Sequence, residues 1–251
     1  MLLERERDPY ENVALEEALF VNNPVDALTV RVWNNARSVV IGRAQLARFE
    51  TDVDLCLSEG IPIVRRFTGG GAVYHGPGNL NWSIAVGRDF SAGGIRYAWD
   101  AREAFRVSAY LVTEAIGMCG AEARFEGPAN RIVSPEGKVS GMAAYLSKDG
   151  MFCHGTLLLR ADLEEAARLT TPARVDLERR YTRSSPMKVA NLKIEQERFV
   201  ASLSAVVAER AGTALEAGSP TEEALDAVRT MLPRYRSAAW NLGDPFSSTT
   251  A

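Results

Sequence analysis

Three consecutive glycines lie between two arginines and a histidine in residues 65–81, which read RRFTGGGAVYHGPGNLN. Glycine has no side chain, so the backbone N–H groups of residues 69–71 can approach an anion or an acyl group closely. Apolar runs on both sides, 61–64 and 80–86, predict two strands that hold this segment as a loop against a substrate. We therefore interpret the segment as an anion- or acyl-binding loop. A glycine-rich hairpin without a ligand is the alternative.

A second segment that could do chemistry, residues 136–145, places Lys138 close to glycines in the sequence EGKVSGMAAY. Such a lysine can project its ammonium into a crowded pocket, where a fixed charge suits negative charge developing on a phosphate or carboxylate. The segment is not a phosphate-binding P-loop, because Val139 follows the lysine. Because Gly-Lys is also a common turn dipeptide, an exposed lysine in a hairpin turn is the alternative.

A third segment, residues 152–159, reads FCHGTLLL and places His154 and Thr156 at the head of an apolar strand. The ordinary interpretation of His154 is a buried histidine that is hydrogen bonded. The chain contains one other histidine, His75, and neither histidine is accompanied by a cluster of Cys or Asp residues. Two isolated histidines are weak support for a metal centre, so we assign no metal ligands.

The elements that must position these segments are a mixture of helices and strands without internal repeats. Asp8 and Pro9, with Glu11 three residues after the cap, predict a helix start. An apolar stripe should bury one face of this helix, through Val13, Ala14, Ala18, Leu19 and Val21. Apolar runs and alternation predict strands over residues 28–32, 39–43, 61–64, 80–86, 138–146 and 152–159. Caps at 100, 162 and 219–222 predict helices, and a disordered polar tail ends the chain.

Composition permits a large core and excludes several classes of protein. The 251 residues, 46% of them hydrophobic, can form one large α/β domain or a large domain with a small appendage. A net charge of −3 gives no support to nucleic-acid binding. The chain has no apolar run of eighteen residues, and residues 1–7 lack the basic-then-apolar pattern of a signal peptide, so we expect no membrane partner. Three separated cysteines, Cys56, Cys119 and Cys153, fit a reduced cytoplasmic protein.

Four motifs within the three segments resemble those of the lipoate-protein ligase A family. The motifs occur in the order Arg65-Arg66-x-Thr68-Gly69-Gly70-Gly71-Ala72-Val73-Tyr74-His75, Gly78-Asn79-Leu80-Asn81, Gly137-Lys138-Val139-Ser140-Gly141-x-Ala143 and His154-Gly155-Thr156-Leu157-Leu158. Residues 8–17 resemble the first helix of that family, and Ile41-Gly42-Arg43-x-Gln45 resembles a strand motif. The match spans roughly residues 8–200.

The resemblance implies a fold, an activity and partners. The fold would be α/β (α+β), with a mixed β-sheet flanked by helices, like that of biotin and lipoate protein ligases. The implied enzyme converts lipoate and ATP, with Mg²⁺, to lipoyl-AMP and pyrophosphate, and then transfers the lipoyl group to a lysine. The acceptor would be a lipoyl domain of the 2-oxoacid dehydrogenase E2 type or a glycine cleavage H protein. No nucleic acid or membrane partner is implied.

The resemblance also implies roles for individual residues. A carboxylate that attacks an α-phosphate builds up negative charge, so the site needs fixed positive charge and backbone donors. Lys138 would be the catalytic residue, bridging the acyl carbonyl and the phosphate. The adenylate would be bound by Arg66, Thr68, Gly69, Gly70, Gly71, Ala72, Val73, His75, Asn79, Ser140, Gly141, Ala143, His154, Gly155 and Thr156. Residues near 127 or in 183–188 could cover the labile adenylate.

Three departures from the family pattern bear on these expectations. Arg131 follows Asn130 where the family has Asn-Asp, so the Mg²⁺ ligands stay unassigned, and Leu46 stands where asparagine is frequent. Residues 238–246 look like the start of the linker to the C-terminal accessory domain of the family. We therefore expect a catalytic domain over 1–235 and a truncated linker or tail over 236–251. The accessory domain would be absent from this chain, and a separate accessory protein could supply it.

Two other functions stay open. The first is an octanoyl or lipoyl transferase of the same fold, either cysteine-dependent or cysteine-independent. The cysteine-dependent kind passes the acyl group through a thioester, but residues 125–130 of this chain contain no thiol. Cys153 is more typical of a small packed side chain than of a nucleophile. The second alternative is a noncatalytic homologue that binds lipoate or acts as a subunit.

Overall fold

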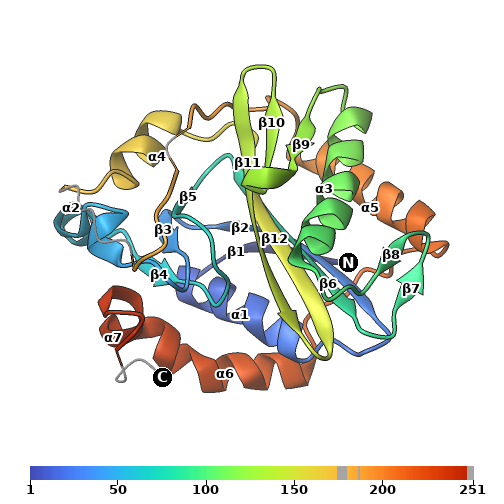
Figure 1. Cartoon of the computed structure of the whole chain (residues 1–251), viewed down its shortest axis with the longest axis horizontal. Helices are drawn as coiled ribbons and strands as arrows, with labels where there is room; N and C mark the ends of the chain where they lie inside the picture. Colours follow the sequence, from blue (N-terminus) through green and yellow to red (C-terminus); the bar gives the residue numbers. More distant parts are fainter. Residues whose placement is uncertain (174–179, 186, 248–251) are drawn as a thin grey trace.

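A seven-stranded mixed sheet forms the centre of the fold, in the order β1-β2-β6-β12-β11-β10-β9 (Figure 1). The computed structural model describes residues 1–173, 180–185 and 187–247. β1 runs parallel to β2, and every other neighbouring pair is antiparallel. The strands are β1 (Leu2–Arg7), β2 (Leu28–Asn35), β6 (Asn79–Gly87), β9 (Arg124–Glu126), β10 (Arg131–Ser134), β11 (Gly137–Ser147) and β12 (Gly150–Leu158).

A smaller sheet, in the order β4-β3-β5, carries the glycine-rich segment. Its strands are β3 (Ser38–Ile41), β4 (Ile63–Arg65) and β5 (Val73–His75). β3 pairs with both of the other strands, so the loop from residue 66 to 72 is anchored at each end on the same strand. A two-stranded ribbon is formed by β7 (Ser91–Ala92) and β8 (Ile95–Arg96).

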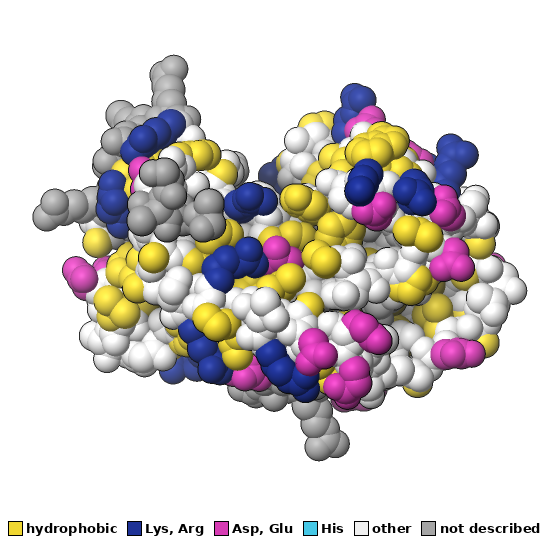
Figure 2. All heavy atoms as spheres, turned by 90° about the horizontal axis from the view of Figure 1, so that it is seen from below, with side chains coloured by type: hydrophobic (Ala, Val, Ile, Leu, Met, Phe, Trp, Pro, Cys, Tyr) yellow, Lys and Arg dark blue, Asp and Glu magenta, His cyan; other side chains and the backbone are white. Residues whose placement is uncertain are grey.

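Helices cover both faces of the large sheet. α3 and α5 pack together on one face, while α1 packs on the other face with α6 outside it (Figure 1). Basic and acidic side chains are interspersed on the face that Figure 2 shows. An Arg236–Glu11 ion pair of 3.1 Å joins α6 to α1. The helices are α1 (Pro9–Val21), η1 (Ala47–Phe49), α2 (Val53–Ser58), α3 (Ala101–Met118), η2 (Gly127–Ala129), α4 (Leu163–Leu169), α5 (Gln196–Ala211), α6 (Glu222–Arg236) and α7 (Ala238–Leu242). Within the described ranges, no helix is long and apolar enough to cross a membrane.

The alternation along β6 explains how one strand serves both the core and a polar site. Leu80, Trp82 and Ile84 belong to the main hydrophobic core beneath α3 and α5. Asn81 and Ser83 point to the opposite face, yet they are also buried. The alternation correctly predicted a strand, but both of its faces are covered. The polar face lies under α1 and the small sheet, where its side chains must find polar partners or a ligand.

The helix starts follow the predicted capping signals. Asp8 accepts hydrogen bonds from the N–H groups of Tyr10 and Glu11, and α1 begins at Pro9. The predicted apolar stripe is wrong at its end, because Val21 lies in the last turn and is 62% exposed. The buried face of α1 contains two polar residues, Asn12 and Glu16, in addition to apolar residues. The sequence also gave no strand signal for β1, whose residues are mainly charged and which forms by long-range pairing with β2.

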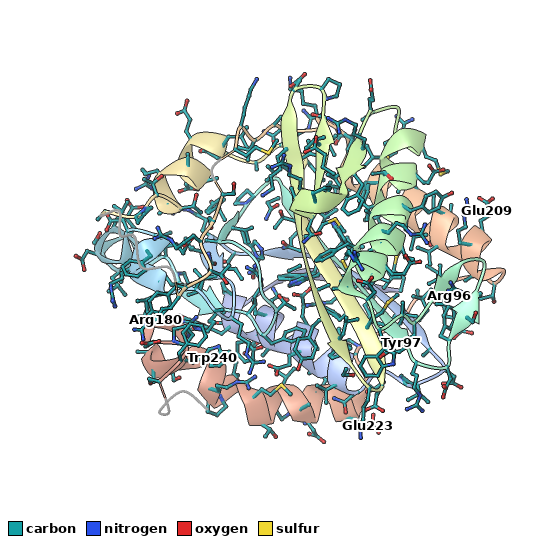
Figure 3. The ribbon with its side chains drawn as sticks, in the orientation of Figure 1. Arg96, Tyr97, Arg180, Glu209, Glu223 and Trp240 are labelled. Carbon is teal, nitrogen blue, oxygen red and sulfur yellow. The ribbon has the colours of Figure 1, made fainter. Side chains whose placement is uncertain are left out.

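The segment after residue 236 packs against the small sheet. α7 contacts β4, and Nε of Arg65 donates to the carbonyl of Trp240 at 2.6 Å. Arg180 and Asp244 form an ion pair of 2.9 Å, and Figure 3 shows Arg180 and Trp240 at the same end of the molecule. The domain boundary at residue 235 stays a prediction. The end of the predicted polar tail, 248–251, lies outside the described residues.

Candidate functional site

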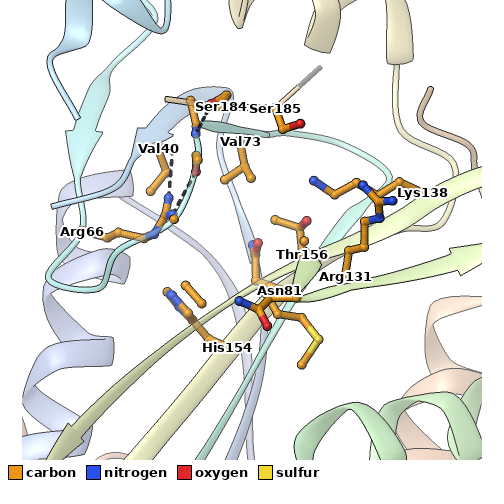
Figure 4. A pocket seen from close by; sticks show the side chains of 18 of the residues that line it. Val40, Arg66, Val73, Asn81, Arg131, Lys138, His154, Thr156, Ser184 and Ser185 are labelled. Atoms are coloured by element: carbon orange, nitrogen blue, oxygen red, sulfur yellow. Dashed lines mark hydrogen bonds between the residues drawn. The ribbon is translucent and has the colours of Figure 1, made fainter. Parts of the chain in front are cut away.

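A cavity of about 470 Å³ lies between the polar face of the large sheet and the glycine-rich loop (Figure 4). β6, β11 and β12 provide one wall, and residues 70–73 with residues 182–185 provide the opposite wall. The cavity therefore brings together segments from all three parts of the sequence that could do chemistry. The predicted site residues that line it are Arg66, Gly70, Gly71, Ala72, Val73, His75, Lys138, Gly141, Ala143, His154, Gly155 and Thr156.

Arg66 holds the backbone of the glycine-rich loop in place through hydrogen bonds to its carbonyl groups. Its guanidinium donates to the carbonyls of Val40 at 3.2 Å, Gly69 at 2.5 Å and Gly71 at 2.8 Å. Burial lowers the pKa of Arg66 to about 10, so the group stays charged at neutral pH. Since these loop carbonyls bind the guanidinium, Arg66 shapes the backbone on which a ligand would rest.

Two adjacent backbone N–H groups of the loop, those of Gly70 and Gly71, have no hydrogen-bond partner among the described residues. Gly70 adopts a φ of 86°, in the left-handed region that favours glycine. Adjacent free N–H groups on a rigid loop are a typical arrangement for binding an anion or a developing oxyanion.

A buried polar chain fixes the loop to α1 and β12. His154 Nδ1 lies 2.7 Å from Oε2 of Glu16, and its Nε2 lies 2.7 Å from Oγ1 of Thr68. Nε of Arg66 in turn donates to the Thr68 hydroxyl at 3.1 Å. Burial alone would raise the pKa of Glu16, but the contact with His154 and the nearby Arg31 hold this pKa below its ordinary value. His154 and Thr68 therefore hold the site in shape, and Glu16 is committed to that network.

His75 cannot supply positive charge to a ligand. Its Nδ1 lies 3.2 Å from the side-chain nitrogen of Asn35, and its ring packs edge-on against Trp33. Burial lowers the pKa of His75 to about 3, so the imidazole is neutral at physiological pH. Its contribution to the cavity wall is shape and polarity.

Lys138 supplies positive charge directly to the cavity. The residue is half-buried at the start of β11, and no described residue forms a hydrogen bond or ion pair with its ammonium. Burial and the charges of Arg131 and Arg66 lower the pKa of Lys138. The alternative of an exposed turn lysine is thus wrong for this geometry. A cation held without a counterion at a cavity wall will attract an anionic ligand.

Four predicted site residues do not line the cavity. Thr68 is fully buried behind the loop, and Gly69 is exposed with its carbonyl bound to Arg66. Asn79 donates to the carbonyl of Tyr74 at 3.1 Å, which ties β6 to the end of β5. Ser140 is buried, and its hydroxyl has no hydrogen-bond partner among the described residues. These residues surround the site without facing its interior.

Several residues that face the cavity were not among the predicted site residues. Asn81 is almost completely buried, and both polar atoms of its amide lack a partner within the described part of the chain. Asn81 belongs to the motif of residues 78–81, but the sequence cannot indicate that its side-chain amide lacks a hydrogen-bond partner. The other additions include Glu16, Trp33, Arg131 and Met142.

The predicted covering segments both lie at the cavity. Pro128 and Ala129 line it, as do residues 182–185 and Met187. Oγ of Ser184 accepts a hydrogen bond from the N–H of Ala72 at 2.8 Å, and Glu50 accepts one from the N–H of Ser184 at 3.0 Å. These bonds hold the second segment against the glycine-rich loop. That it covers a reaction intermediate stays a prediction.

The cavity wall does not fit a protein-held Mg²⁺ ion. Mg²⁺ sites in nucleotide enzymes use one or two carboxylates together with substrate phosphates. Glu16 is the one carboxylate among the described lining residues, and His154 and Trp33 already bind it. Over the described ranges, no group of three His, Cys, Asp or Glu residues could hold a metal ion.

Gly141 gives Lys138 its room, which leads to a first prediction. A Cβ atom at residue 141 would lie 3.0 Å from Nζ and 3.2 Å from Cε of Lys138. In Gly141→Ala, we expect the flexible lysine end to move aside, so that the unfolding temperature changes little. Because a displacement of about 1 Å can cost on the order of 10²-fold in rate, activity should fall by at least tenfold. Calorimetry and a turnover assay on the same variant test this, and an unchanged rate would contradict it.

Comparison with known proteins agrees with this geometry. Residues 8–209 match the family model described as the lipoyl protein ligase A/B catalytic domain. One similar structure is that of a bipartite lipoate protein ligase from Thermoplasma acidophilum, described together with its E2 lipoyl domain. Its sequence is 25% identical to this chain. Its TM-score is 0.81, with 96% of this chain and 95% of that chain covered. A second T. acidophilum structure, with bound lipoic acid, is 26% identical with a TM-score of 0.81 and coverage of 96% and 98%.

A structure of lipoate-protein ligase A bound with ATP shows the same level of likeness. It is 26% identical, with a TM-score of 0.80 over 96% of this chain and 98% of that chain. These similarities confirm the predicted mixed α/β fold with a sheet flanked by helices. They also agree with the resemblance that the motifs indicated.

Proposed function

The chain belongs to the lipoyl protein ligase A/B catalytic domain family, and from this premise we propose that it is a lipoate-protein ligase. The proposed enzyme activates lipoate with ATP to lipoyl-AMP and transfers the lipoyl group to a lysine of an acceptor lipoyl domain. One observation carries the proposal: Lys138, Gly70 and Gly71 line the same cavity, and no described residue binds the ammonium of Lys138 or the backbone N–H groups of the two glycines.

The walls of the cavity suit the two halves of a lipoyl-adenylate. Val13, Trp33, Val40 and Val73 provide apolar surface for a dithiolane ring and its alkyl chain. Lys138 and the loop N–H groups provide charge and hydrogen-bond donors for the carbonyl and phosphate oxygens. An apolar wall beside a few fixed polar groups is the usual composition of a small-molecule site.

The residues act by position and charge. Lys138 binds the acyl carboxylate and the α-phosphate together, which offsets the repulsion between two anions as they approach. In the transfer step, the same ammonium and the loop N–H groups stabilise the oxyanion that forms when the acceptor lysine attacks the carbonyl. The leaving group is AMP. Mg²⁺, when it accompanies ATP, would be bound through the nucleotide phosphates.

The names of the relatives support the choice of substrates and partners. One relative binds lipoic acid and another binds ATP. The T. acidophilum ligase is bipartite and is described together with an E2 lipoyl domain. We extend these features to this chain: its acceptor is a lipoyl domain of the E2 or H-protein type, and a separate small protein assists adenylation. Three buried free thiols suit the reducing cytoplasm, where we place the reaction.

The partner requirement can be tested by measuring pyrophosphate release from lipoate, ATP and Mg²⁺. We expect weak release by this chain alone and strong release after a small accessory protein of the same organism is added. Transfer from preformed lipoyl-AMP should need no accessory protein, because that step uses the cavity alone. Full release without a partner would contradict the accessory requirement and leave the ligase assignment standing.

A thioester-forming transferase is the second candidate, and the cysteines provide its test. Cys153 is 1% exposed, and burial raises the pKa of its thiol to about 12, so it forms little thiolate at neutral pH. We predict that the combined variant Cys56→Ser, Cys119→Ser, Cys153→Ser still transfers a lipoyl group from lipoyl-AMP. An acyl adduct on Cys153 detected by mass spectrometry would favour the transferase.

A further inference from the structure

We propose that Arg131 binds a phosphate group of the nucleotide, so that two side-chain cations neutralise phosphate charge where the cavity wall offers no metal-binding carboxylate. This inference rests on the proposed function, because it assigns the nucleotide to the cavity. Arg131 stands where the family has an aspartate after Asn130. The contacts of Arg131 and Lys138 carry the inference.

The backbone places Arg131 and Lys138 on the same side of one strand pair. Arg131 opens β10, and its Cα pairs with that of Gly141 on β11. The side chain of Lys138 extends to Gly141 as well, since Nζ of Lys138 lies 3.0 Å from where a Cβ atom at residue 141 would be. Figure 4 shows the two side chains at one end of the cavity, both among its lining residues. Gly141 leaves open the space where both cations can reach one ligand.

The charges at this end of the cavity are unbalanced without an anion. Arg131 is bound to Glu126 of β9, with Nε and the terminal nitrogen Nη2 each 2.7 Å from Oε2, and its other terminal nitrogen, Nη1, has no hydrogen-bond or ion-pair partner in the described part of the chain. Glu126 also pairs with Arg124 at 2.8 Å, so one carboxylate serves two arginines. Lys138 has no carboxylate partner among the described residues. Two cations, Arg131 and Lys138, therefore line this end of the cavity, and Glu126 is the one carboxylate among the described residues that pairs with either of them. This excess of positive charge favours the entry of an anionic group, and the side chain of Arg131 is 27% exposed and can meet it.

The chemistry of arginine indicates which anion fits. A guanidinium presents paired N–H donors that match two oxygens of a phosphate, whereas an ammonium acts as a point charge. The pair can thus bind one phosphate group from two directions, with Lys138 shared with the acyl carboxylate. Because Glu16 is committed to His154, the described wall provides no carboxylate that would compete for this position.

Arg124 provides a matched control. It binds the same carboxylate as Arg131, but its side chain is 71% exposed and it does not line the cavity. Arg131→Gln and Arg124→Gln therefore each remove one arginine from Glu126, and only the first removes a cation from the cavity. Arg131→Lys keeps the charge and loses the paired donors.

The test is calorimetric titration of the full chain with ATP in EDTA, and again with Mg²⁺. We expect the wild-type chain to bind ATP in EDTA. Arg131→Gln should weaken binding by about 10- to 100-fold, the effect expected for loss of a charge-assisted hydrogen bond. Arg124→Gln should stay within about twofold, and Arg131→Lys should fall between. Thermal unfolding of all variants checks that each is folded.

The outcomes separate this inference from the proposed function. Equal ATP affinities for Arg131→Gln and Arg124→Gln would overturn the inference, as would failure of the wild-type chain to bind ATP without metal. A parallel assay of lipoyl transfer from preformed lipoyl-AMP tests the proposed function. Absence of transfer with Arg131-dependent ATP binding would reject the ligase and retain the phosphate site. Lipoyl transfer together with ATP binding that does not depend on Arg131 would retain the ligase and reject the phosphate site.

Discussion

Replacement of Lys138 by alanine is expected to reduce both lipoyl-AMP formation and lipoyl transfer by at least about 10²–10³-fold, the loss seen when one preorganised donor is removed from an active site. Its ammonium is the cavity cation without a partner among the described residues, and the loop N–H groups cannot replace a full charge. Pyrophosphate release measures the first step, and the mass of the acceptor measures the second.

The fold should survive this substitution. Lys138 is half-buried and its backbone bonds to residues 188 and 190 do not depend on the side chain, so the unfolding temperature should change little. Lys138→Arg should also lose activity, because a planar guanidinium cannot occupy the space of a compact ammonium beside Gly141. Adenylation at the wild-type rate in Lys138→Ala would remove Lys138 from its central role.

The second large effect is expected for Gly42→Ala. A Cβ at residue 42 would lie 2.2 Å from the carbonyl oxygen of Gly70, which belongs to rigid backbone. The glycine-rich loop must therefore move, and with it Gly70 and Gly71, which line the cavity. We expect overpacking to cost about 1–3 kcal/mol of stability and displacement of the loop to lower turnover by on the order of 10²-fold. Chemical denaturation and a transfer assay measure the two effects.

Gly117→Ala is the matched control for Gly42→Ala. It makes the same chemical change in α3, where a Cβ would meet no atom within 4 Å. Because alanine favours helix over glycine, this variant should be as stable as the wild type or slightly more stable, with unchanged activity. Equal behaviour of the two variants would contradict the role assigned to the contact between Gly42 and the loop.

The sequence was sufficient to predict the elements that carry local signals. Strand β6 was predictable because its side chains alternate in polarity, and α1 and α3 were predictable because Asp8 and Asp100 cap their first turns. The glycine-rich loop and Lys138 were identified because consecutive glycines let the backbone approach a ligand and a lysine among glycines can project its charge into a pocket. Each of these inferences depends on residues that are close in the sequence.

The remaining features depend on contacts between distant segments. Glu16 reads as one more polar residue of an amphipathic helix, and its link to His154 spans 138 positions. Arg66 looks like a ligand-binding cation, but its guanidinium binds the loop carbonyls. Ser184 reads as a loop residue, yet its hydroxyl accepts a hydrogen bond from Ala72. Tertiary packing decides these roles, and no periodicity or motif encodes them.

The central claim is that this cavity holds a lipoyl-adenylate and delivers its acyl group to a lysine. The most direct measurement is the mass of an E2-type lipoyl domain after incubation with preformed lipoyl-AMP and the wild-type chain, with Lys138→Ala as the control. We predict a mass increase of one lipoyl group, confined to a single lysine, with the wild-type chain and not with the variant. An unmodified acceptor in the presence of bound lipoyl-AMP would contradict the claim and favour a noncatalytic lipoate-binding protein.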